Sequence, residues 1–354
     1  MAYDKDNLAI CSYNSTGFGL AAQDFMDKLL LFSDILCIQE HFVLDCKDRN
    51  HSNTDKIRER FNDNHDMFIV PAKKDTTQVT RGRGVGGLAT IWKRSLTKYV
   101  KRINCDNSRI QATMFHIPDC PLLVINTYFP CDPRSSHSDF TELIELLGDL
   151  EGIVSNVECT NILIAGDLNC HFNRNSNFTS IVQHWINNFN LKILWSQDNE
   201  RIEPVDFTFM NTTCEPFTFS TIDHFILSPC MLNGLVSAGV IHDGSNLSNH
   251  SPIHVTFEVG KIDLRIHNYV PRTKVLWEAA SGEAKHTFKR TFEEKLDAIS
   301  IPCECTDIHC KSEEHKEQLE EYTISVLKAM EDAGIECLPS SSSAKKKKRN
   351  IVPG

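Results

Sequence analysis

The chain has 354 residues, of which 41% are hydrophobic and 24% are charged, a composition typical of globular proteins. Its formal net charge of −10 at pH 7 excludes a protein that holds nucleic acid through an overall positive field. No basic segment followed by an apolar core opens the chain, and no apolar run reaches the roughly 18 residues of a membrane span. We therefore expect a nuclear or cytoplasmic protein that is not secreted and has no membrane partner, and we expect its 14 scattered cysteines to be reduced.

Apolar runs bounded by turn residues recur as far as residue 260 and predict strands. The clearest runs are residues 8–13, 34–39, 67–70, 88–92, 122–128, 161–165, 222–227 and 253–259. A helical stripe extends from about Gly19 to Phe32. A second follows Asp139 and Glu142, which are spaced as a capping box, and ends near Val157. Many strands with few helices predict an α/β sandwich with mixed or antiparallel sheets.

The pattern changes after residue 260. Two helices are predicted, near 283–299 and 313–333. Four potential metal ligands lie between them, and they predict either a zinc site or a plain reduced loop: Cys303, Cys305, His309 and Cys310. The Ser- and Lys-rich end predicts a disordered basic tail, which serves either as a nuclear-localisation patch or as a solvated linker. We divide the chain into a main domain at 1–260, a helical connector at 261–339 and a tail at 340–354.

Polar side chains follow the most apolar of the predicted strands. The segment 162–169 reads Ile-Leu-Ile-Ala-Gly-Asp-Leu-Asn, so Asp167 and Asn169 stand one residue apart where a buried strand ends. Because side chains alternate along a strand, both should point to the same side. A carboxylate and an amide directed at one point can hold water, phosphate or a metal ion. Capping of the turn by Asp167 is the structural alternative.

Other predicted strands end in similar residues, namely Asn14, Glu40, Tyr128, Asp223 and His250. Together they provide what hydrolysis of a phosphate ester requires. Carboxylate oxygens bind a hard divalent cation, and an oriented water attacks while donors meet the charge that builds on the phosphoryl oxygens. A histidine close to the phosphate can move a proton. Taken singly, Glu40 is better explained as a solvated surface carboxylate, and the alternative for Asp223 with His224 is a structural pair at the start of a strand.

The order of these residues resembles the endonuclease/exonuclease/phosphatase family, also called the exonuclease III-like or DNase I-like fold. The matching motifs are Asn14, Gln39-Glu40, Tyr128, Gly166-Asp167-x-Asn169, Ile222-Asp223-His224 and Ser248-x-His250-x-Pro252. The resemblance implies a four-layer α/β sandwich of two packed mixed sheets flanked by helices. Here we expect a small helical C-terminal extension in addition. The resemblance also implies phosphoester cleavage that depends on Mg²⁺, with Mn²⁺ as an alternative.

The resemblance also implies roles for individual residues. The expected metal ligands are Glu40, Asn14 and Asp223. The expected catalytic residues are Asp167, which orients or activates the water, Asn169, which steadies the phosphate, Tyr128, which assists, and His250, which contacts the scissile phosphate. Asn249 and His224 are expected to be supporting residues, with His224 in a structural or indirect role.

A narrower resemblance rests on residues 83–93 and 126–132, which are similar to the endonuclease domain of non-long-terminal-repeat retrotransposons. It implies an endonuclease with DNA as substrate that nicks one strand and leaves a 3′-hydroxyl to prime reverse transcription. The segment after residue 260 is similar to the connector that leads to a reverse transcriptase, a domain absent from this chain. The alternatives are a phosphoesterase of the same fold that acts on RNA, phospholipid or inositol phosphate, and a catalytically decayed binding module.

Asn249 departs from the family pattern, which usually has Ser-Asp-His-x-Pro with the Asp supporting the His. An amide can orient an imidazole but cannot stabilise its protonated form by charge. On this reasoning we expect His250 to hold a proton less well near neutral pH, and we expect reduced activity or none.

Gly82, Gly84 and Gly87 match the spacing of a dinucleotide-binding fingerprint. The fingerprint requires a helix to follow, whereas residues 88–92 predict a strand, so we interpret the glycines as a tight turn. Basic residues flank this turn and offer either phosphate or DNA contacts or a solvated loop: Arg81, Arg83, Lys93 and Arg94.

Overall fold

A computed structural model of the chain describes residues 6–45, 47–48, 51–52, 54–74, 84–118, 120–132, 140–212, 215–261, 277, 280–302 and 312–339. The chain divides into two compact units, Met1–Asn268 and Tyr269–Gly354. Among the described residues, no helix is both long enough and apolar enough to cross a membrane. The predicted zinc ligands at 303–310 and the basic tail lie outside the described residues, and the division at 260 and 339 stays a prediction.

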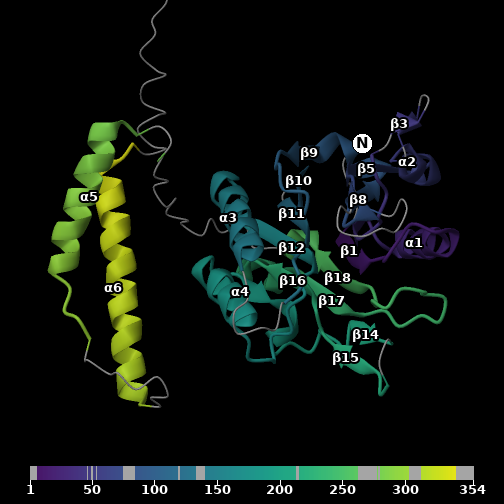
Figure 1. Cartoon of the computed structure of the whole chain (residues 1–354). Helices are drawn as coiled ribbons and strands as arrows, with labels where there is room; N and C mark the ends of the chain where they lie inside the picture. Colours follow the sequence, from purple (N-terminus) through teal and green to yellow (C-terminus); the bar gives the residue numbers. More distant parts are fainter. Residues whose placement is uncertain are drawn as a thin grey trace, which may run out of the picture. The chain divides into compact units, whose positions relative to one another are not determined.

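The first unit contains two six-stranded sheets (Figure 1). The first sheet has the order β17 (Leu235–Val240), β18 (Ile253–Glu258), β1 (Asn7–Asn14), β2 (Ile35–Gln39), β8 (Leu88–Lys93) and β5 (His65–Val70). The second has the order β13 (Lys192–Ile193), β16 (Asp223–Leu227), β12 (Asn161–Asp167), β11 (Cys120–Tyr128), β10 (Ile110–Ile117) and β9 (Val100–Ile103). Each sheet is mixed, because β1 is parallel to β2 and β11 is parallel to β12 while the other pairs in both sheets are antiparallel. All eight strands that the apolar runs predict are present.

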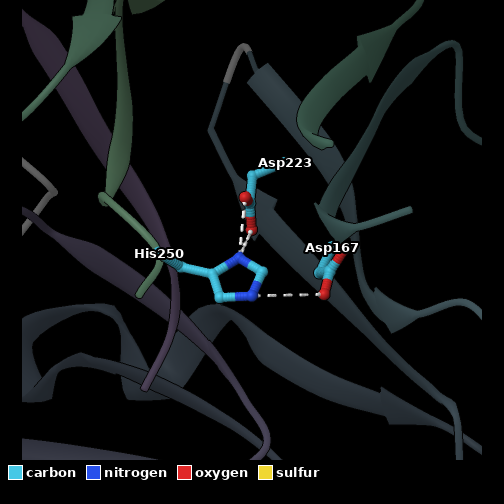
Figure 2. Close-up of side chains that lie close together, drawn as sticks. All are labelled: Asp167, Asp223 and His250. Carbon is cyan, nitrogen blue, oxygen red and sulfur yellow. Dashed lines mark hydrogen bonds and ion pairs between the residues drawn. The ribbon is translucent and has the colours of Figure 1, made fainter. Parts of the chain in front are cut away.

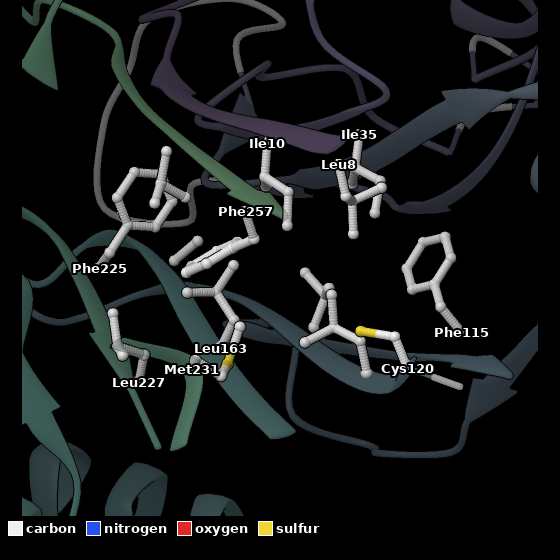
Figure 3. Close-up of a cluster of buried hydrophobic side chains, with 14 of the residues drawn as sticks. Leu8, Ile10, Ile35, Phe115, Cys120, Leu163, Phe225, Leu227, Met231 and Phe257 are labelled. Carbon is white, nitrogen blue, oxygen red and sulfur yellow. The ribbon is translucent and has the colours of Figure 1, made fainter. Parts of the chain in front are cut away.

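Helices cover the outer faces of both sheets and complete the predicted four-layer sandwich. The first sheet packs against α1 (Leu20–Phe32) and α2 (Asp55–Phe61) through one apolar cluster, and the second packs against α3 (Thr141–Asn156) and α4 (Asn177–Asn188) through another. A third cluster fills the space between the sheets (Figure 3). Because both faces of each sheet are buried, the strands read as continuous apolar runs and not as alternating ones.

Strand periodicity decides which residues face the space between the sheets. Leu8 and Ile10 of β1 lie in the inter-sheet cluster, while Cys11 and Tyr13 face the helices. In the second sheet Leu163 of β12 likewise faces inward. Every second side chain of a strand points to the same face. Asn14 at the end of β1 and Asp167 at the end of β12 therefore also point into the layer between the sheets.

A buried polar contact joins the two sheets near these strand ends. Asn126 of β11 donates hydrogen bonds to the carbonyl oxygens of Ile38 (3.1 Å) and Ala89 (3.0 Å) in the opposite sheet. The Nε2 of Gln39 donates in return to Oδ1 of Asn126, at 2.8 Å. Because a buried amide is stable only when it is hydrogen-bonded, these contacts restrict how the sheets can slide past one another.

Two local predictions have different outcomes. The predicted capping box is wrong, because α3 begins at Thr141 with Phe140 as its N-cap, and Phe140 offers no capping oxygen. The glycines do not precede a helix, because β7 (Gly84–Val85) is followed by strand β8, as predicted. Gly84 itself lies in β7 and not in a turn, and Gly82 lies outside the described residues. Gly87 has φ +93°, and a Cβ there would lie 2.5 Å from the ring of His41.

The remaining strands form three short antiparallel pairs: β3 (Lys47–Asp48) with β4 (His51–Ser52), β6 (Lys73–Lys74) with β7, and β14 (Phe209–Asn211) with β15 (Thr218–Ser220). The second unit contains the predicted helical extension, formed by α5 (Gly282–Asp297) and α6 (Glu313–Cys337). On α5 the rings of Phe288 and Phe292 stack with centroids 5.9 Å apart.

Candidate active site

The ends of five strands bring the predicted polar residues together. Register pairs Asn14 of β1 with Gln39, the last residue of β2, so the following Glu40 lies beside Asn14. In the second sheet Asp167 of β12 is the register partner of Tyr128 on one side and of Asp223 on the other. All of these side chains meet at one end of the inter-sheet layer.

Asn14 connects the two carboxylates on which the metal prediction depends. Its Nδ2 lies 3.0 Å from Oε2 of Glu40 and 3.0 Å from Oδ2 of Asp167, and it donates to both. Its Oδ1 accepts a hydrogen bond from the backbone N of Thr16, at 3.1 Å. Asn14 therefore holds the carboxylates in place, and its role as a metal ligand stays a prediction.

His250 lies between two aspartates (Figure 2). Its Nδ1 donates to the carboxylate of Asp223, at 2.9 Å from Oδ2 and 3.2 Å from Oδ1, and its Nε2 lies 3.9 Å from Oδ2 of Asp167. All three side chains are buried. The ring of Phe209 packs against the imidazole, with centroids 4.7 Å apart.

This arrangement corrects the prediction made from Asn249. His250 does have an acidic partner, which is Asp223 and not its sequence neighbour. Burial alone would lower the pKa of His250, but the carboxylates of Asp223 and Asp167 outweigh it and raise the pKa to about 9. His250 therefore holds its proton more firmly than an isolated histidine, the opposite of our expectation.

Asp167 and Tyr128 are also perturbed. Burial raises the pKa of Asp167 to about 7, although the nearby charge of His250 opposes the shift. Burial and the carboxylates of Glu40 and Asp167 raise the pKa of Tyr128, which therefore remains a neutral phenol and hydrogen-bonds to Glu40. Asn169 donates from Nδ2 to the carbonyl of Phe129 and from its backbone N to Oδ1 of Asp167, each at 2.9 Å.

Backbone strain gathers at the same place. Glu40 and Asn169 adopt positive φ values of 54° and 48°, as do Thr16 and Phe42 at 46° and 58°. Non-glycine residues rarely adopt this region, and such residues cluster at functional sites. The conformation allows the chain to leave a strand and still direct a polar side chain back toward the strand ends.

A cavity of about 800 Å³ opens over these residues. Its lining includes five of the predicted site residues together with Asn249: Glu40, Tyr128, Asp167, Asn169 and His250. Among the described residues that line it, Arg174 is the only lysine or arginine. Its guanidinium donates to the carbonyl of Phe219 (3.4 Å) and to Oγ of Ser220 (3.0 Å), and sequence reasoning missed it because no motif marks a lone arginine in a loop.

The other predicted residues lie elsewhere. Arg81 and Arg83 are outside the described residues. Lys93 forms an ion pair with Asp34, 2.9 Å away, at the end of β8 opposite to Glu40, so it does not reach the cavity. Arg94 follows it and bonds to Asn62. His224 is buried on the other face of β16, where its Nε2 donates to the carbonyl of Cys170 at 2.8 Å.

The donor set fits a hard divalent cation. One carboxylate oxygen from Asp167, one from Asp223 and a nitrogen of His250 lie within 4.8 Å of one another. The carboxylate of Glu40 lies close to that of Asp167, because Asn14 donates a hydrogen bond to each of them. Oxygen-rich sites of this kind suit Mg²⁺ and Mn²⁺. Because both oxygens of Asp223 face His250, and because the raised pKa of His250 keeps its ring protonated and unable to bind a cation, we expect Glu40 and Asp167 to provide most of the binding.

The profile of the Endonuclease/Exonuclease/phosphatase family matches residues 12–250, from β1 to His250. The chain belongs to this family. No curated protein matches the sequence significantly. Family membership gives the chain a phosphodiesterase fold, with the buried Asp167, Asp223 and His250 at the strand ends.

Solved structures of the Endonuclease/Exonuclease/phosphatase fold are similar to this one. AP endonuclease LMAP from Leishmania major has 15% identity and a TM-score of 0.53, over 72% of this chain and 88% of that one. The endonuclease domain of TRAS1, a telomere-specific non-LTR retrotransposon, has 14% identity and a TM-score of 0.51, over 72% and 100%. An AP endonuclease from Archaeoglobus fulgidus has 15% identity and a TM-score of 0.52, over 71% and 99%. At such identities the likeness shows the fold alone.

Proposed function

We propose that this protein is a Mg²⁺-dependent DNA endonuclease that nicks one strand and leaves a 3′-hydroxyl. The observation that carries the proposal is the His250–Asp223 pair beside Asp167 and Glu40 at the base of an open cavity. Hydrolysis transfers the hydroxyl of water to phosphorus and a proton to the departing 3′-oxygen. Asp167 can accept the proton that the attacking water loses, and a solvent water supplies the proton for the departing 3′-oxygen.

Different residues of the site carry out the different parts of the hydrolysis. Asp167, whose burial raises its pKa, accepts a proton from the attacking water. His250 remains protonated near neutral pH and donates from Nε2 to a phosphoryl oxygen, while Asp223 fixes the ring through Nδ1. The amide of Asn169 supplies a further donor, because its Nδ2 has a second hydrogen, and the neutral phenol of Tyr128 assists by holding Glu40. A divalent cation held by Glu40 and Asp167 would offset the phosphate charge and acidify a bound water.

The charge of the site supports a metal-dependent reaction. Glu40, Asp132 and Asp167 line the cavity and repel a phosphodiester, while Arg174 is the one guanidinium on its described lining. A cation therefore has to neutralise the carboxylates before DNA can approach closely. This local neutralisation is compatible with a chain whose net charge is −10.

The retrotransposon assignment belongs to the same proposal. It is supported by residues 83–93 and 126–132 and by the likeness to the TRAS1 endonuclease domain. In that setting the 3′-hydroxyl would prime DNA synthesis by a reverse transcriptase domain, which would be the partner of this protein. The protein would act in the nucleus.

Nicking of supercoiled plasmid tests the proposal. Purified full-length protein in Mg²⁺ should convert supercoiled plasmid to relaxed circles, and EDTA should abolish the conversion. Glu40→Gln and His250→Asn should each lose at least about 10²-fold in rate. The matched controls Glu145→Gln on α3 and His184→Asn on α4 change exposed side chains away from the cavity and should nick as the wild type does.

Two results would reject the proposal. Folded wild-type protein that leaves plasmid intact but hydrolyses a small soluble phosphoester in Mg²⁺ would assign it to the other phosphoesterases of this fold. Protein that retards DNA on a gel but cleaves no phosphoester would be a decayed binding module.

A further inference from the structure

A second cavity, of about 330 Å³, lies beside the first and has no part in the chemistry above. Two segments form most of its wall, the loop after Asn169 and the segment from β13 to Val205. His224 contributes from β16. Because side chains alternate along a strand, His224 faces away from the layer that its neighbour Asp223 enters. We call this cavity the side pocket.

The buried imidazole of His224 has an unused acceptor. Its Nε2 lies 2.8 Å from the carbonyl oxygen of Cys170 and 3.2 Å from that of Thr221, and a carbonyl can only accept, so Nε2 carries the hydrogen. Nδ1 of the neutral ring is then an acceptor, and it is buried with no hydrogen-bond partner among the described residues. His224 itself is 2% exposed. A buried polar atom without a partner costs free energy that a ligand with an N–H group would recover.

The walls indicate what kind of ligand fits. Phe172 and Trp195 provide aromatic surface, and the lining also contains aliphatic side chains such as Ile202. No lysine or arginine is among the described lining residues, whereas Asp198 and Glu203 are. Such a site disfavours phosphate and favours a flat, uncharged group that presents N–H donors. The volume is at the small end of the range for ligand sites, about 300–1,000 Å³.

The side pocket adjoins the catalytic cavity. His171 lines both of them. The indole Nε1 of Trp195 donates to the backbone carbonyl of Asp223, at 3.1 Å, so one wall of the side pocket contacts the residue that orients His250. A polymer whose phosphodiester occupies the catalytic cavity therefore has neighbouring units within reach of the side pocket.

We propose that the side pocket binds one unpaired base of the nucleic-acid substrate and selects bases that carry an exocyclic amino group. The base stacks on the aromatic walls, and its amino group donates to Nδ1 of His224. Stacking on aromatic side chains together with hydrogen bonds to a base edge is the usual means of recognising an unpaired base. This inference rests on the proposed function for its substrate class, but base binding can be measured without catalysis.

The first experiment compares two nucleosides with wild-type full-length protein by equilibrium dialysis. Deoxyadenosine and purine deoxyriboside have the same shape, but only deoxyadenosine has the 6-amino group. We expect deoxyadenosine to bind about tenfold more tightly, as for one hydrogen bond to a buried acceptor. Equal affinity, or no binding of either nucleoside at millimolar concentration, would overturn the proposal, and neither result depends on a substitution.

The second experiment blocks the side pocket with a larger side chain at Val205, a half-buried residue of its lining. Val205→Trp should remove deoxyadenosine binding, whereas Val236→Trp, at an exposed position on β17 outside both cavities, should keep it. Thermal unfolding of both variants checks that they fold. Retained binding in folded Val205→Trp would place the nucleoside elsewhere and reject the side pocket.

The last experiment maps plasmid nicks by end sequencing. Wild-type protein should prefer amino-bearing bases at one position near the nick, and Val205→Trp should lose this preference while still nicking. An unchanged base profile would overturn the role in substrate selection. Amino-dependent binding by a wild-type protein that does not nick would sink the proposed function and leave the base-binding site standing.

Discussion

Asp167 and Asp223 are direct register partners on the antiparallel strands β12 and β16. Both side chains enter the space between the sheets, and His250, from the loop before β18, lies against both of them. One aspartate orients the imidazole through Nδ1, and the other stands 3.9 Å from Nε2. Strand register places the two aspartates side by side, and the position of the His250 ring gives them different roles.

Asp223→Asn should lower kcat about 10²- to 10⁴-fold, because the amide no longer stabilises the charged imidazole. His250 loses its proton as the pH rises through its pKa of about 9, so wild-type nicking should decline above that pH. Removing the Asp223 charge lowers this pKa, so the decline should begin at a lower pH. A pH–rate profile of both proteins measures the shift, and superimposable alkaline limbs would contradict the assignment.

Asn249→Asp should change kcat by less than about fivefold. His250 already has Asp223 as its acidic partner, and a new carboxylate at an exposed position interacts weakly with its surroundings. Plasmid nicking under single-turnover conditions measures the effect. A gain of a hundredfold or more would restore the original prediction that Asn249 impairs the site.

Arg174→Ala should raise KM for DNA about tenfold or more and change kcat less, because a guanidinium on the lining of the cavity would bind phosphate in the ground state as well as in the transition state. The slope of log affinity against log salt should fall by about one unit. Arg290→Ala on α5 serves as the control, since that side chain is exposed and pairs with Glu294. Loss of kcat with unchanged KM would place Arg174 in the chemical step instead.

Gly166→Ala should destabilise the fold by more than about 3 kcal/mol. Gly166 has φ +149°, and a Cβ there would lie 1.9 Å from the carbonyl oxygen of Thr127 on the neighbouring strand. Gly148→Ala on α3 meets open space and should stabilise the protein by about 0.5–1 kcal/mol. Urea denaturation measures both free energies of unfolding, and similar values for the two variants would refute the clash.

The free energy of unfolding should depend on pH through His41. Burial lowers the pKa of His41 to about 4, below its value near 6.5 in the unfolded chain. The folded state therefore favours the neutral ring, so this contribution is complete above pH 6.5 and is lost as the pH falls toward 4. At pH 5 the loss is about 2 kcal/mol.

A His41→Gln variant isolates this term. Its deficit in unfolding free energy relative to the wild type should shrink between pH 7.5 and pH 5, as measured by urea denaturation. His184→Gln, at an exposed position on α4, is the matched control substitution. A constant deficit for His41→Gln would mean that His41 does not titrate as expected.

Local sequence patterns had clear limits as predictors of the elements. The short helix α2 and the helix α4 went unpredicted, as did β10, although each buries an apolar face against the rest of the fold. The stripe of α4 is interrupted by polar residues, and β10 is stabilised by pairing with β9 and β11 on either side. Tertiary packing outweighs weak local propensity in such segments.

The sequence by itself predicted eight of the strands in the two large sheets and the polar residues at their ends. Strand periodicity and the run Gly166-Asp167-Leu168-Asn169 are local properties, which can be recognised in each segment without knowing its neighbours in space. Only the tertiary structure decided that Asp223 and not Asn249 supports His250, that Asn14 holds two carboxylates, and that Arg174 reaches the cavity. The physical reason is distance along the chain: Asp223 and His250 are 27 residues apart and Asn14 and Asp167 are 153 apart, so only the packing of two sheets brings them into contact.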